Sequence, residues 1–556
     1  MRVRPTAPDR EDDMRLFGRP VRGGRRVVRT GRARLEVAVE TARRGFVVRG
    51  TVSGRPGRVE VIRLPVPRAF LMNNWQSWGP AQVAGPADVF PELGEIHARS
   101  PFGFSPFLGE LLDRVWSDYF VAWDGAVLGF LTSRVGHPFF LVEGAELVGY
   151  VDYFDAEFAD PVPLEPLAAL GGAPVEDLLE AYGSLVKREN RVRINPWNPV
   201  GWCSWYHYFG NLAWDDVVRN VEAARRLRRA MPIEVFQVDD GYEHDIGDWT
   251  RGRPGYPSLD GLAGAITKRG FRAGIWTAPF SAAETSDLSA AHPGWLVAES
   301  GRPKFAHRSW GRTIHALDLT RPAVQAHLFD LFSGLRKAGF DYFKVDFLFG
   351  AAMPGERLKK VTPIQAYRQG LRVIRKAVGK SFILGCGAPL LPSVGLVDGM
   401  RIGEDTAPYW KTRPSAFQGP NAYFALKNAF LRQFMHRRLW LNDPDCLLLR
   451  ERDIDLGRGE RELYALACGA LDNMVIDSDN LESLGEDGRA LFRRALALRG
   501  GRSRVLGLLG EDAYVIRSRG GPAGDFDMAV NLSDETRAVR GRALVPRSGE
   551  MLPPAE

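Results

Sequence analysis

The sequence predicts a multidomain α/β protein with a central (β/α)8 TIM barrel, an N-terminal antiparallel β-sandwich and a small C-terminal β-domain. Three observations lead to this prediction. The 556 residues are enough for about three to four domains. Short apolar segments alternate with longer helical patterns through the middle of the chain, which is typical of a barrel of parallel strands. Short alternating runs separated by turn residues fill both ends of the chain, which is typical of antiparallel sheets.

Residues 1–170 are expected to form the sandwich. Runs such as 35–41 (LEVAVET) and 58–66 (RVEVIRLPV) alternate apolar and polar residues, and Gly, Pro and Arg turns separate them. A helix is predicted at about 174–187 (PVEDLLEAYGSLVK). It lies in the segment 171–195, which we expect to link the sandwich to the barrel.

Residues 196–500 are expected to form the barrel, with helical patterns such as 215–230 and 321–339 between its strands. Eight alternations favour a closed barrel over a doubly wound sheet, and no nucleotide-binding glycine motif follows the first strand. Short strand-like runs return in residues 501–556, the predicted C-terminal β-domain. The eight strand candidates cover residues 201–206, 235–240, 272–280, 342–347, 382–387, 399–405, 438–443 and 473–479.

The formal net charge is +7, from 74 Lys and Arg residues against 67 Asp and Glu residues. Most basic residues have acidic neighbours, and the one dense basic segment runs from Arg2 to Arg49. No aromatic stacking pattern or nucleic-acid motif accompanies this segment, which favours a solvated Arg-rich surface over an arm that binds nucleic acid. We therefore expect no nucleic-acid partner.

The sequence also lacks the patterns of a membrane segment or a metal site. No stretch approaches the roughly eighteen uninterrupted apolar residues of a membrane helix, and no apolar h-region follows the first charges. The four cysteines have no metal-ligand spacing, the nine histidines share no spacing, and no HExxH motif occurs. We expect a cytoplasmic protein with free thiols, no metal, no cofactor and no membrane contact.

Polar residues gather where the predicted barrel strands end, which is where the active site of such a barrel forms. A single Asp at such a place is more often a turn or helix-capping residue, but the number of polar side chains here favours a site. Lys344 and Asp346 are two residues apart, so both point from one strand face into the barrel mouth. The strand-end residues are Asp239, Asp240, Trp276, Lys344, Asp346, Cys386, Arg401, Glu404, Asp405, Asn442, Asp443 and Asp445.

Paired carboxylates combined with tryptophans are the residue types that glycoside hydrolysis needs. One carboxylate attacks the anomeric carbon, another protonates the leaving oxygen, and aromatic faces stack on the sugar. Core packing explains about half of the tryptophans equally well. The tryptophans in question are Trp75, Trp78, Trp202, Trp205 and Trp276.

A series of short motifs runs in order along nearly the whole chain. With these motifs the sequence resembles glycoside hydrolase family 36, the α-galactosidase family of the melibiase clan, and it is similar in length to the compact bacterial and archaeal branch. Each motif alone is weak, but their order and placement at strand ends are specific. They include NNWQSWG (73–79), GWCSWY (201–206), VDDG (238–241), FKVDF (343–347), LGCGAPL (384–390), RIGEDT (401–406) and NDPDCLLLR (442–450).

The resemblance implies a retaining exo-α-galactosidase that removes terminal α-linked galactose by double displacement through a glycosyl-aspartate intermediate. It implies that Asp346 is the nucleophile and Asp405 the acid/base. It further implies that Asp239 and Asp240 bind the galactose O4 and O6 hydroxyls. The other implied pocket residues are Trp276, Lys344, Cys386, Arg401 and Trp75, the last lent by the sandwich.

Two other functions remain open at this stage. A galactosyl transferase of the raffinose-synthase kind shares the barrel and passes galactose to a sugar hydroxyl instead of water. A non-catalytic carbohydrate-binding protein is disfavoured because both candidate carboxylates are present. The expected partner is a small α-galactoside. The sequence does not decide the oligomeric state, and a homo-oligomer is one possibility. Because Lys344 is close to Asp346 in sequence, we expect Asp346 to be ionised.

Overall fold

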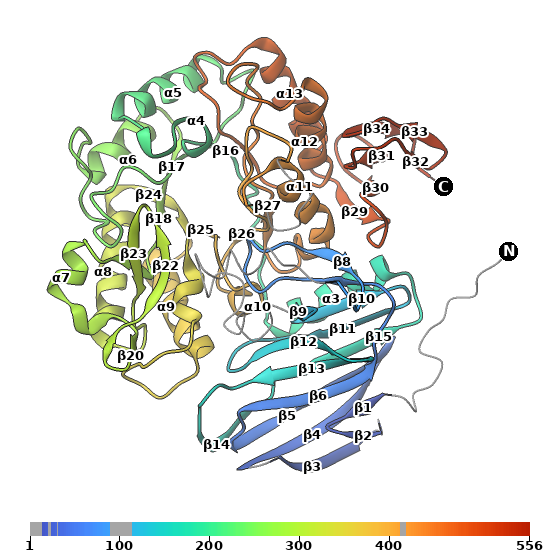
Figure 1. Cartoon of the computed structure of the whole chain (residues 1–556). Helices are drawn as coiled ribbons and strands as arrows, with labels where there is room; N and C mark the ends of the chain where they lie inside the picture. The colour runs from blue at the N-terminus through green and yellow to red at the C-terminus, as the bar shows by residue number, and fades with distance from the viewer. Residues whose placement is uncertain (1–13, 21–23, 31, 89–113, 412–418, 556) are drawn as a thin grey trace.

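The computed structural model describes residues 14–20, 24–30, 32–88, 114–411 and 419–555 (Figure 1). A (β/α)8 barrel occupies the upper left of Figure 1, the N-terminal sandwich lies below and to the right of it, and the C-terminal strands lie at the upper right. This arrangement confirms the predicted fold class.

Two antiparallel sheets make up the N-terminal sandwich. In β4, Ala33, Leu35 and Val37 are buried whereas the residues between them are exposed, so one face of the strand packs on the core. The first sheet has the order β2-β1-β6-β13-β12-β9. Its strands are β1 (Arg15–Leu16), β2 (Arg19–Pro20), β6 (Arg58–Pro65), β9 (Trp116–Asp118), β12 (His137–Glu143) and β13 (Glu146–Asp152).

The second sheet has the order β3-β4-β5-β15-β11-β10-β7-β8, and β14 pairs with β5. The helix α3 (Val175–Glu189) follows the sandwich and packs on β11. The strands of the second sheet are β3 (Gly24–Thr30), β4 (Arg32–Ala42), β5 (Gly45–Arg55), β7 (Phe70–Met72), β8 (Gln82–Ala84), β10 (Phe120–Trp123), β11 (Ala126–Phe130), β14 (Phe158–Pro163) and β15 (Leu167–Gly171).

Eight parallel strands form the barrel sheet in the order β27-β26-β25-β24-β18-β17-β16-β28. A backbone hydrogen bond from Met474 N to Asn442 O (3.0 Å) joins the two ends of this order, so the barrel is nearly closed. The strands are β16 (Val200–Cys203), β17 (Val235–Val238), β18 (Arg272–Thr277), β24 (Phe340–Val345), β25 (Phe382–Gly385), β26 (Gly399–Arg401), β27 (Leu441–Asp443) and β28 (Val475–Asp477).

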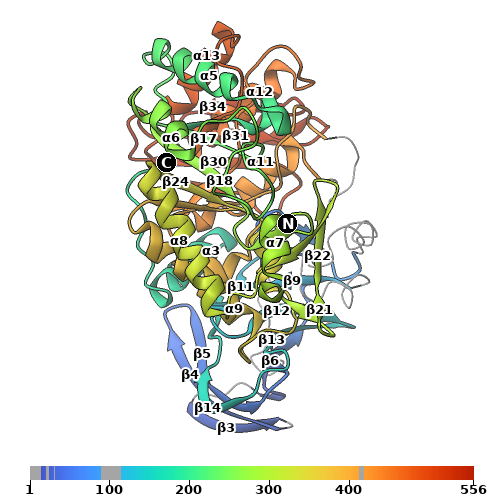
Figure 2. The ribbon, with the colours of Figure 1, turned by 90° about the vertical axis from the view of Figure 1, so that its left-hand side faces the viewer.

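Helices cover the outside of the barrel, and Figure 2 shows α6, α8 and α9 along the side that faces the viewer. In α9, Thr362 accepts a hydrogen bond from the backbone N–H of Gln365 and Pro363 follows it, a strong signal for a helix start. The helices are α4 (Trp205–Tyr208), α5 (Trp214–Arg226), α6 (Leu259–Thr267), α8 (Pro322–Ala338), α9 (Pro363–Val378), α10 (Leu390–Ser393), α11 (Ala422–Leu431), α12 (Arg458–Ala470) and α13 (Glu486–Ala497), with the 3₁₀ turns η2 (Phe209–Asn211), η4 (Leu348–Ala352) and η5 (Gln433–Met435).

An insertion between β18 and β24 adds a small antiparallel sheet with the order β19-β23-β22. Its tip is the turn between β22 and β23, where Trp310 has φ 54° and Gly311 has φ 71°. A non-glycine residue in this left-handed region is uncommon. The insertion contains β19 (Ser281–Ala283), α7 (Asp287–Ala291), η3 (Pro293–Trp295), β20 (Ala298–Glu299), β21 (Arg302–Pro303), β22 (Phe305–Ser309) and β23 (Arg312–Ala316).

The C-terminal part returns to antiparallel strands in the order β29-β30-β31-β34, with β32 and β33 as a separate pair. No helix in the described ranges is long and apolar enough to cross a membrane. The C-terminal strands are β29 (Arg502–Leu506), β30 (Ala513–Arg519), β31 (Phe526–Asn531), β32 (Arg537–Val539), β33 (Arg542–Leu544) and β34 (Ser548–Leu552).

Candidate active site

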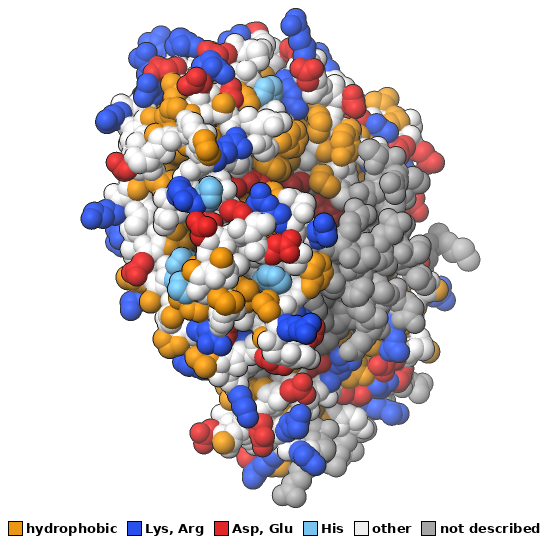
Figure 3. Space-filling model, turned by 60° about the vertical axis from the view of Figure 1, so that its left-hand side comes forward, with side chains coloured by type: hydrophobic (Ala, Val, Ile, Leu, Met, Phe, Trp, Pro, Cys, Tyr) orange, Lys and Arg blue, Asp and Glu red, His pale blue; other side chains and the backbone are white. Residues whose placement is uncertain are grey.

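The barrel order brings together side chains that are far apart in sequence. β24 pairs with β18 on one side and with β25 on the other, and β26 follows β25. The residues at these strand ends therefore share one mouth of the barrel. Figure 3 shows acidic, basic and histidine side chains mixed across the middle of one face of the molecule. Seven predicted site residues at these ends are buried, namely Asp239, Asp240, Trp276, Lys344, Asp346, Cys386 and Arg401.

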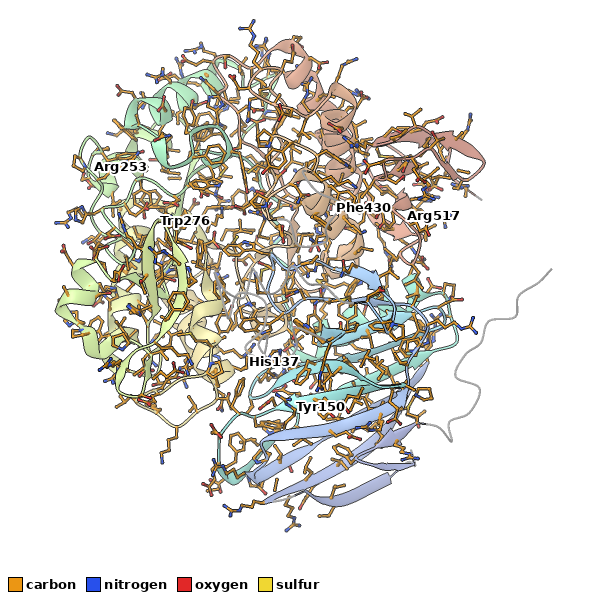
Figure 4. All side chains as sticks on the ribbon, in the orientation of Figure 1. His137, Tyr150, Arg253, Trp276, Phe430 and Arg517 are labelled. Carbon is orange, nitrogen blue, oxygen red and sulfur yellow. The ribbon has the colours of Figure 1, made fainter. Side chains whose placement is uncertain are left out.

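Asp346 follows β24 and is held by two N–H donors. Trp276 Nε1 donates to its Oδ2 (3.1 Å), and the backbone N–H of Phe347 donates to its Oδ1 (2.7 Å). Phe347 has φ 50°, so the chain turns sharply just after the carboxylate. Figure 4 labels Trp276, which lies in β18. The two donors fix the direction in which this carboxylate points.

Burial raises the pKa of the Asp346 carboxyl, and the opposing effects of Lys344 and the Trp276 N–H do not cancel the increase. Lys344 thus favours the charged form of Asp346 less strongly than burial opposes it, and the expectation that Asp346 is ionised stays a prediction. The reason is geometric, because the Lys344 ammonium forms its ion pair with Asp239 (Nζ to Oδ2, 2.9 Å) and not with Asp346.

Asp239 and Asp240 follow β17 and have different partners. Asp239 Oδ2 accepts from Lys344 and also from the amide of Gln237. Asp240 Oδ2 accepts from Trp310 Nε1 (2.7 Å) at the tip of the β22–β23 turn. Burial raises the pKa values of Asp240 and of its neighbour Glu243. The two adjacent carboxyl groups thus form one buried, polar corner of the site.

Asp405 lies beyond β26 beside Arg401. Arg401 Nη2 is 2.5 Å from Asp405 Oδ1, 2.7 Å from Asp445 Oδ2 and 3.3 Å from the Tyr206 hydroxyl. The Tyr206 hydroxyl in turn donates to Asp445. The Asp405 side chain is 33% exposed, whereas that of Arg401 is 1% exposed. Asp405 is therefore a carboxylate open to solvent that is supported from below by a buried arginine.

Glu404, next to Asp405, is buried at 5% exposure. Burial raises its pKa to about 8, and the neighbouring charge of Asp405 adds to the increase. Among the described residues, Glu404 Oε2 has no hydrogen-bond partner. This carboxyl group is accordingly neutral near pH 7.

The sandwich contributes a loop to the barrel mouth, and two of its tryptophans lie differently. The Trp75 ring stacks on His137 of β12 at 5.8 Å and is completely buried; Figure 4 labels His137 on the sandwich. Trp78 instead donates from Nε1 to Cys386 Sγ (3.3 Å). The structure thus brings Trp78 to Cys386 and keeps the Trp75 ring against the sandwich.

Four further side chains contact the predicted pocket residues. Tyr206 and Asp445 support Arg401, Trp310 donates to Asp240, and Trp78 donates to Cys386. The sequence pointed to Asp445 as a strand-end residue and to Trp78 as a candidate tryptophan, but it assigned neither a part in the pocket. Tyr206 was available only as the last residue of the motif GWCSWY, and Trp310 lies outside the quoted motifs.

The strand ends offer carboxylates, an ammonium and aromatic rings for chemistry without a metal. Among the described residues, three potential metal ligands converge at His244, Asp248 and Asp287, with their ligand atoms within 4.8 Å of one another. Asp248 already accepts from the backbone N–H groups of Asp287 and Leu288. Asp287 pairs with Arg251 at 2.8 Å. That the protein needs no cofactor stays a prediction.

Two protein families match successive parts of this chain. Residues 38–171 match the family described as "Alpha-galactosidase, N-terminal", and residues 171–374 match the family described as "Melibiase". The α-galactosidase AgaA of Geobacillus stearothermophilus is 28% identical over 217 residues, which is 36% of this chain and 27% of that protein. The match therefore spans less than a third of that curated relative.

Two solved structures match over most of both chains. TtGalA, an α-galactosidase from Thermus thermophilus in complex with p-nitrophenyl α-D-galactopyranoside, has 29% identity and a TM-score of 0.72, covering 90% of this chain and 98% of the other. Its complex with stachyose has 30% identity and a TM-score of 0.70, covering 86% and 100%. The likeness includes both the sandwich and the barrel.

Proposed function

This chain belongs to the α-galactosidases of glycoside hydrolase family 36, and from that membership we propose that it removes terminal α-linked galactose from oligosaccharides with retention of configuration. One observation carries the proposal: Asp346 and Asp405 lie at the ends of two strands, β24 and β26, that flank β25 in one barrel. The complexes of TtGalA with an aryl α-galactoside and with stachyose support this substrate class.

The proposed reaction has two steps. In the first, an Asp346 oxygen attacks the anomeric carbon while Asp405 gives a proton to the departing glycosidic oxygen, which leaves a galactosyl-aspartate. In the second, Asp405 takes a proton from water, and this water displaces Asp346. The two N–H donors on Asp346 support this role because they hold the carboxylate in one direction.

Asp405 is suited to the acid/base role by its exposure and its partner. Water must reach it in the second step, and its side chain is partly exposed. Arg401 fixes its position from the buried side and is itself held by Asp445. Arg401 also stabilises the negative charge that Asp405 carries after it has given up its proton.

The pair Asp239 and Asp240 is proposed to bind the galactose hydroxyls. Asp239 forms an ion pair with Lys344, and Asp240 accepts a hydrogen bond from Trp310. Carboxylates in fixed positions accept hydrogen bonds from hydroxyl groups and discriminate between sugars that place these groups differently. Trp276, which contacts the Trp310 ring, and Trp78, which contacts the Phe347 ring, add aromatic rings at the same barrel mouth.

A panel of aryl glycosides tests the proposed function. We expect rapid release of the aryl alcohol from the α-galactoside and little or none from β-galactoside and α-glucoside. Product analysis with and without an added acceptor sugar then separates hydrolysis from galactosyl transfer. Absence of turnover on every aryl α-galactoside would contradict the proposal and favour a carbohydrate-binding protein.

A further inference from the structure

A buried arginine joins the sandwich loop to the barrel. Arg432 follows α11 directly and is completely buried. Its guanidinium donates four hydrogen bonds between 2.7 and 2.9 Å, three to the loop 73–79 and one to the segment after β26. Within the described residues it forms no ion pair, so these oxygens are what hold it.

The three bonds to the sandwich loop surround Trp78. Arg432 Nη1 donates to Ser77 O and Nη2 donates to Gly79 O, which are the carbonyls on either side of this tryptophan. Nε donates to Asn73 Oδ1 at the start of the loop. The arginine therefore determines where the Trp78 backbone sits.

Trp78 lies directly beside the proposed nucleophile. A Cβ added to Gly387 would be 3.0 Å from Asp346 Oδ1 and 3.0 Å from the Trp78 ring, so the carboxylate and the ring flank the same glycine. The Nε1 of Trp78 also donates to Cys386 Sγ. A shift of the loop would thus change the wall next to Asp346.

The fourth bond reaches the other proposed catalytic group. Arg432 Nη1 donates to Ile402 O (2.8 Å), three residues before Asp405. Burial lowers the pKa of Arg432 to about 10, so the side chain still carries its charge at pH 7. A planar guanidinium can satisfy oxygens from two segments at once, which the single ammonium of lysine cannot do in the same plane.

We propose that Arg432 is a positioning residue that fixes the Trp78 loop and the Ile402–Asp405 segment relative to each other. The inference rests on the proposed function, because that function makes Asp346, beside the Trp78 loop, and Asp405 the catalytic groups. Arg432 itself touches neither proposed catalytic carboxylate by a hydrogen bond in the structure and acts through the backbone.

The test is Arg432→Lys assayed for kcat/KM on two substrates, because kcat/KM reports only the first step, in which Asp405 acts as the acid. p-Nitrophenyl α-galactoside has a good leaving group and needs little acid assistance, whereas raffinose releases a sugar oxygen that must be protonated. A misplaced Asp405 should therefore lower kcat/KM on raffinose at least tenfold more than kcat/KM on the aryl substrate. The ratio of the two kcat/KM values does not depend on how much enzyme is folded, so loss of fold alone leaves it unchanged.

Arg461→Lys is the matched control. Arg461 is also a buried arginine, on α12; it donates to the backbone carbonyl of Leu449 (2.9 Å) and lies 3.8 Å from Asp487 Oδ2, and neither partner belongs to the loop 73–79 or to the Ile402–Asp405 segment. We expect its ratio to equal that of the wild-type protein. If Arg432→Lys does not fold, Asn73→Ala removes the acceptor of Nε, together with the bond that the Asn73 amide donates to Asn74 O, and should shift the ratio in the same direction by a smaller factor.

The outcomes are distinct. If the ratio in Arg432→Lys equals the wild-type ratio, the positioning role is overturned while the proposed function stands. Where the lysine variant does not fold, the same conclusion follows from a wild-type ratio in Asn73→Ala. A wild-type protein that hydrolyses neither substrate overturns the proposed function, and the inference with it.

Discussion

Asp346 and Asp405 are chemically the same side chain in different surroundings. Asp346 is 5% exposed and is held by the Trp276 indole and a backbone N–H. Asp405 is partly exposed and is paired with Arg401. A fixed, enclosed carboxylate fits nucleophilic attack, and an accessible one fits proton exchange with a leaving group and water.

Glu404 gives a prediction about stability and pH. Its pKa is about 8 in the folded protein and about 4.3 in an unfolded chain, so between these values the folded state binds more protons. The contribution of this group to the free energy of unfolding is therefore largest below pH 4 and falls as the pH rises to 8. Glu404→Gln removes this dependence.

We expect Glu404→Gln to gain stability relative to wild type between pH 5 and pH 8, by on the order of 2 to 4 kcal/mol. Urea unfolding of both proteins at the two pH values measures this change. An equal difference in unfolding free energy at pH 5 and pH 8 would show that Glu404 does not titrate in this range.

The carboxylate pair Asp239 and Asp240 leads to a prediction about sugar specificity. Galactose and glucose differ only in the direction of the O4 hydroxyl, and a site built to bind one direction leaves buried charge unsatisfied with the other. We expect kcat/KM on aryl α-galactoside to exceed that on the matching α-glucoside by about 10⁴-fold. Comparable values on the two substrates would refute the assigned role of the pair.

At the scale of elements, the insertion between β18 and β24 places a tryptophan over the barrel mouth. Trp310 has a positive φ at the tip of a turn, donates to Asp240 and contacts the Phe347 ring at 4.8 Å. Strained backbone of this kind persists where its surroundings hold it and often marks a functional position.

Trp310→Phe should keep the ring contact and lose the hydrogen bond to Asp240. A hydrogen bond to a charged group contributes about 1.5 to 3 kcal/mol, so we expect KM for an α-galactoside to rise by about tenfold or more. Thermal unfolding serves as the control and should change little. A lower melting temperature with unchanged KM would mean that the tryptophan only stabilises the insertion.

The strands of the barrel were predictable from sequence because each has an apolar run followed by polar residues. The ends of these strands were less predictable. The run 201–206 was predicted as one strand, but β16 ends at Cys203 and α4 begins at Trp205. A short apolar run does not distinguish a buried strand from a helix by its period. Bonds such as Trp310 to Asp240 join segments about 70 residues apart, and no local pattern encodes them.

At the scale of the whole molecule, the sandwich loop 73–79 completes the barrel mouth. Ser77 N donates to Ala388 O (2.9 Å), Leu390 N donates to Trp75 O (3.0 Å), and Arg432 binds the loop from the other side. The resemblance predicted that the sandwich lends a tryptophan to the pocket and named Trp75. The contacts favour Trp78 as the tryptophan that the sandwich lends to the pocket. Measuring KM for Trp75→Phe and for Trp78→Phe distinguishes the two tryptophans.

The charged side chains at the strand ends predict that catalytic activity does not depend on metal ions. Lys344 is already paired with Asp239, and Arg401 with Asp405 and Asp445. We therefore expect dialysis against EDTA to leave kcat unchanged within about twofold. Loss of activity that a divalent cation restores would contradict the expectation and direct attention to His244, Asp248 and Asp287.

The most direct measurement is peptide mass mapping of the Asp405→Gly variant after incubation with p-nitrophenyl α-galactoside. The good leaving group departs without acid assistance, but no general base then activates water, so the galactosyl-enzyme accumulates. We expect the added mass of one galactosyl residue on the peptide that contains Asp346, and no adduct when Asp346→Asn is combined with it. An adduct on a different residue, or wild-type turnover of raffinose by the Asp405→Gly variant, would contradict the assignment.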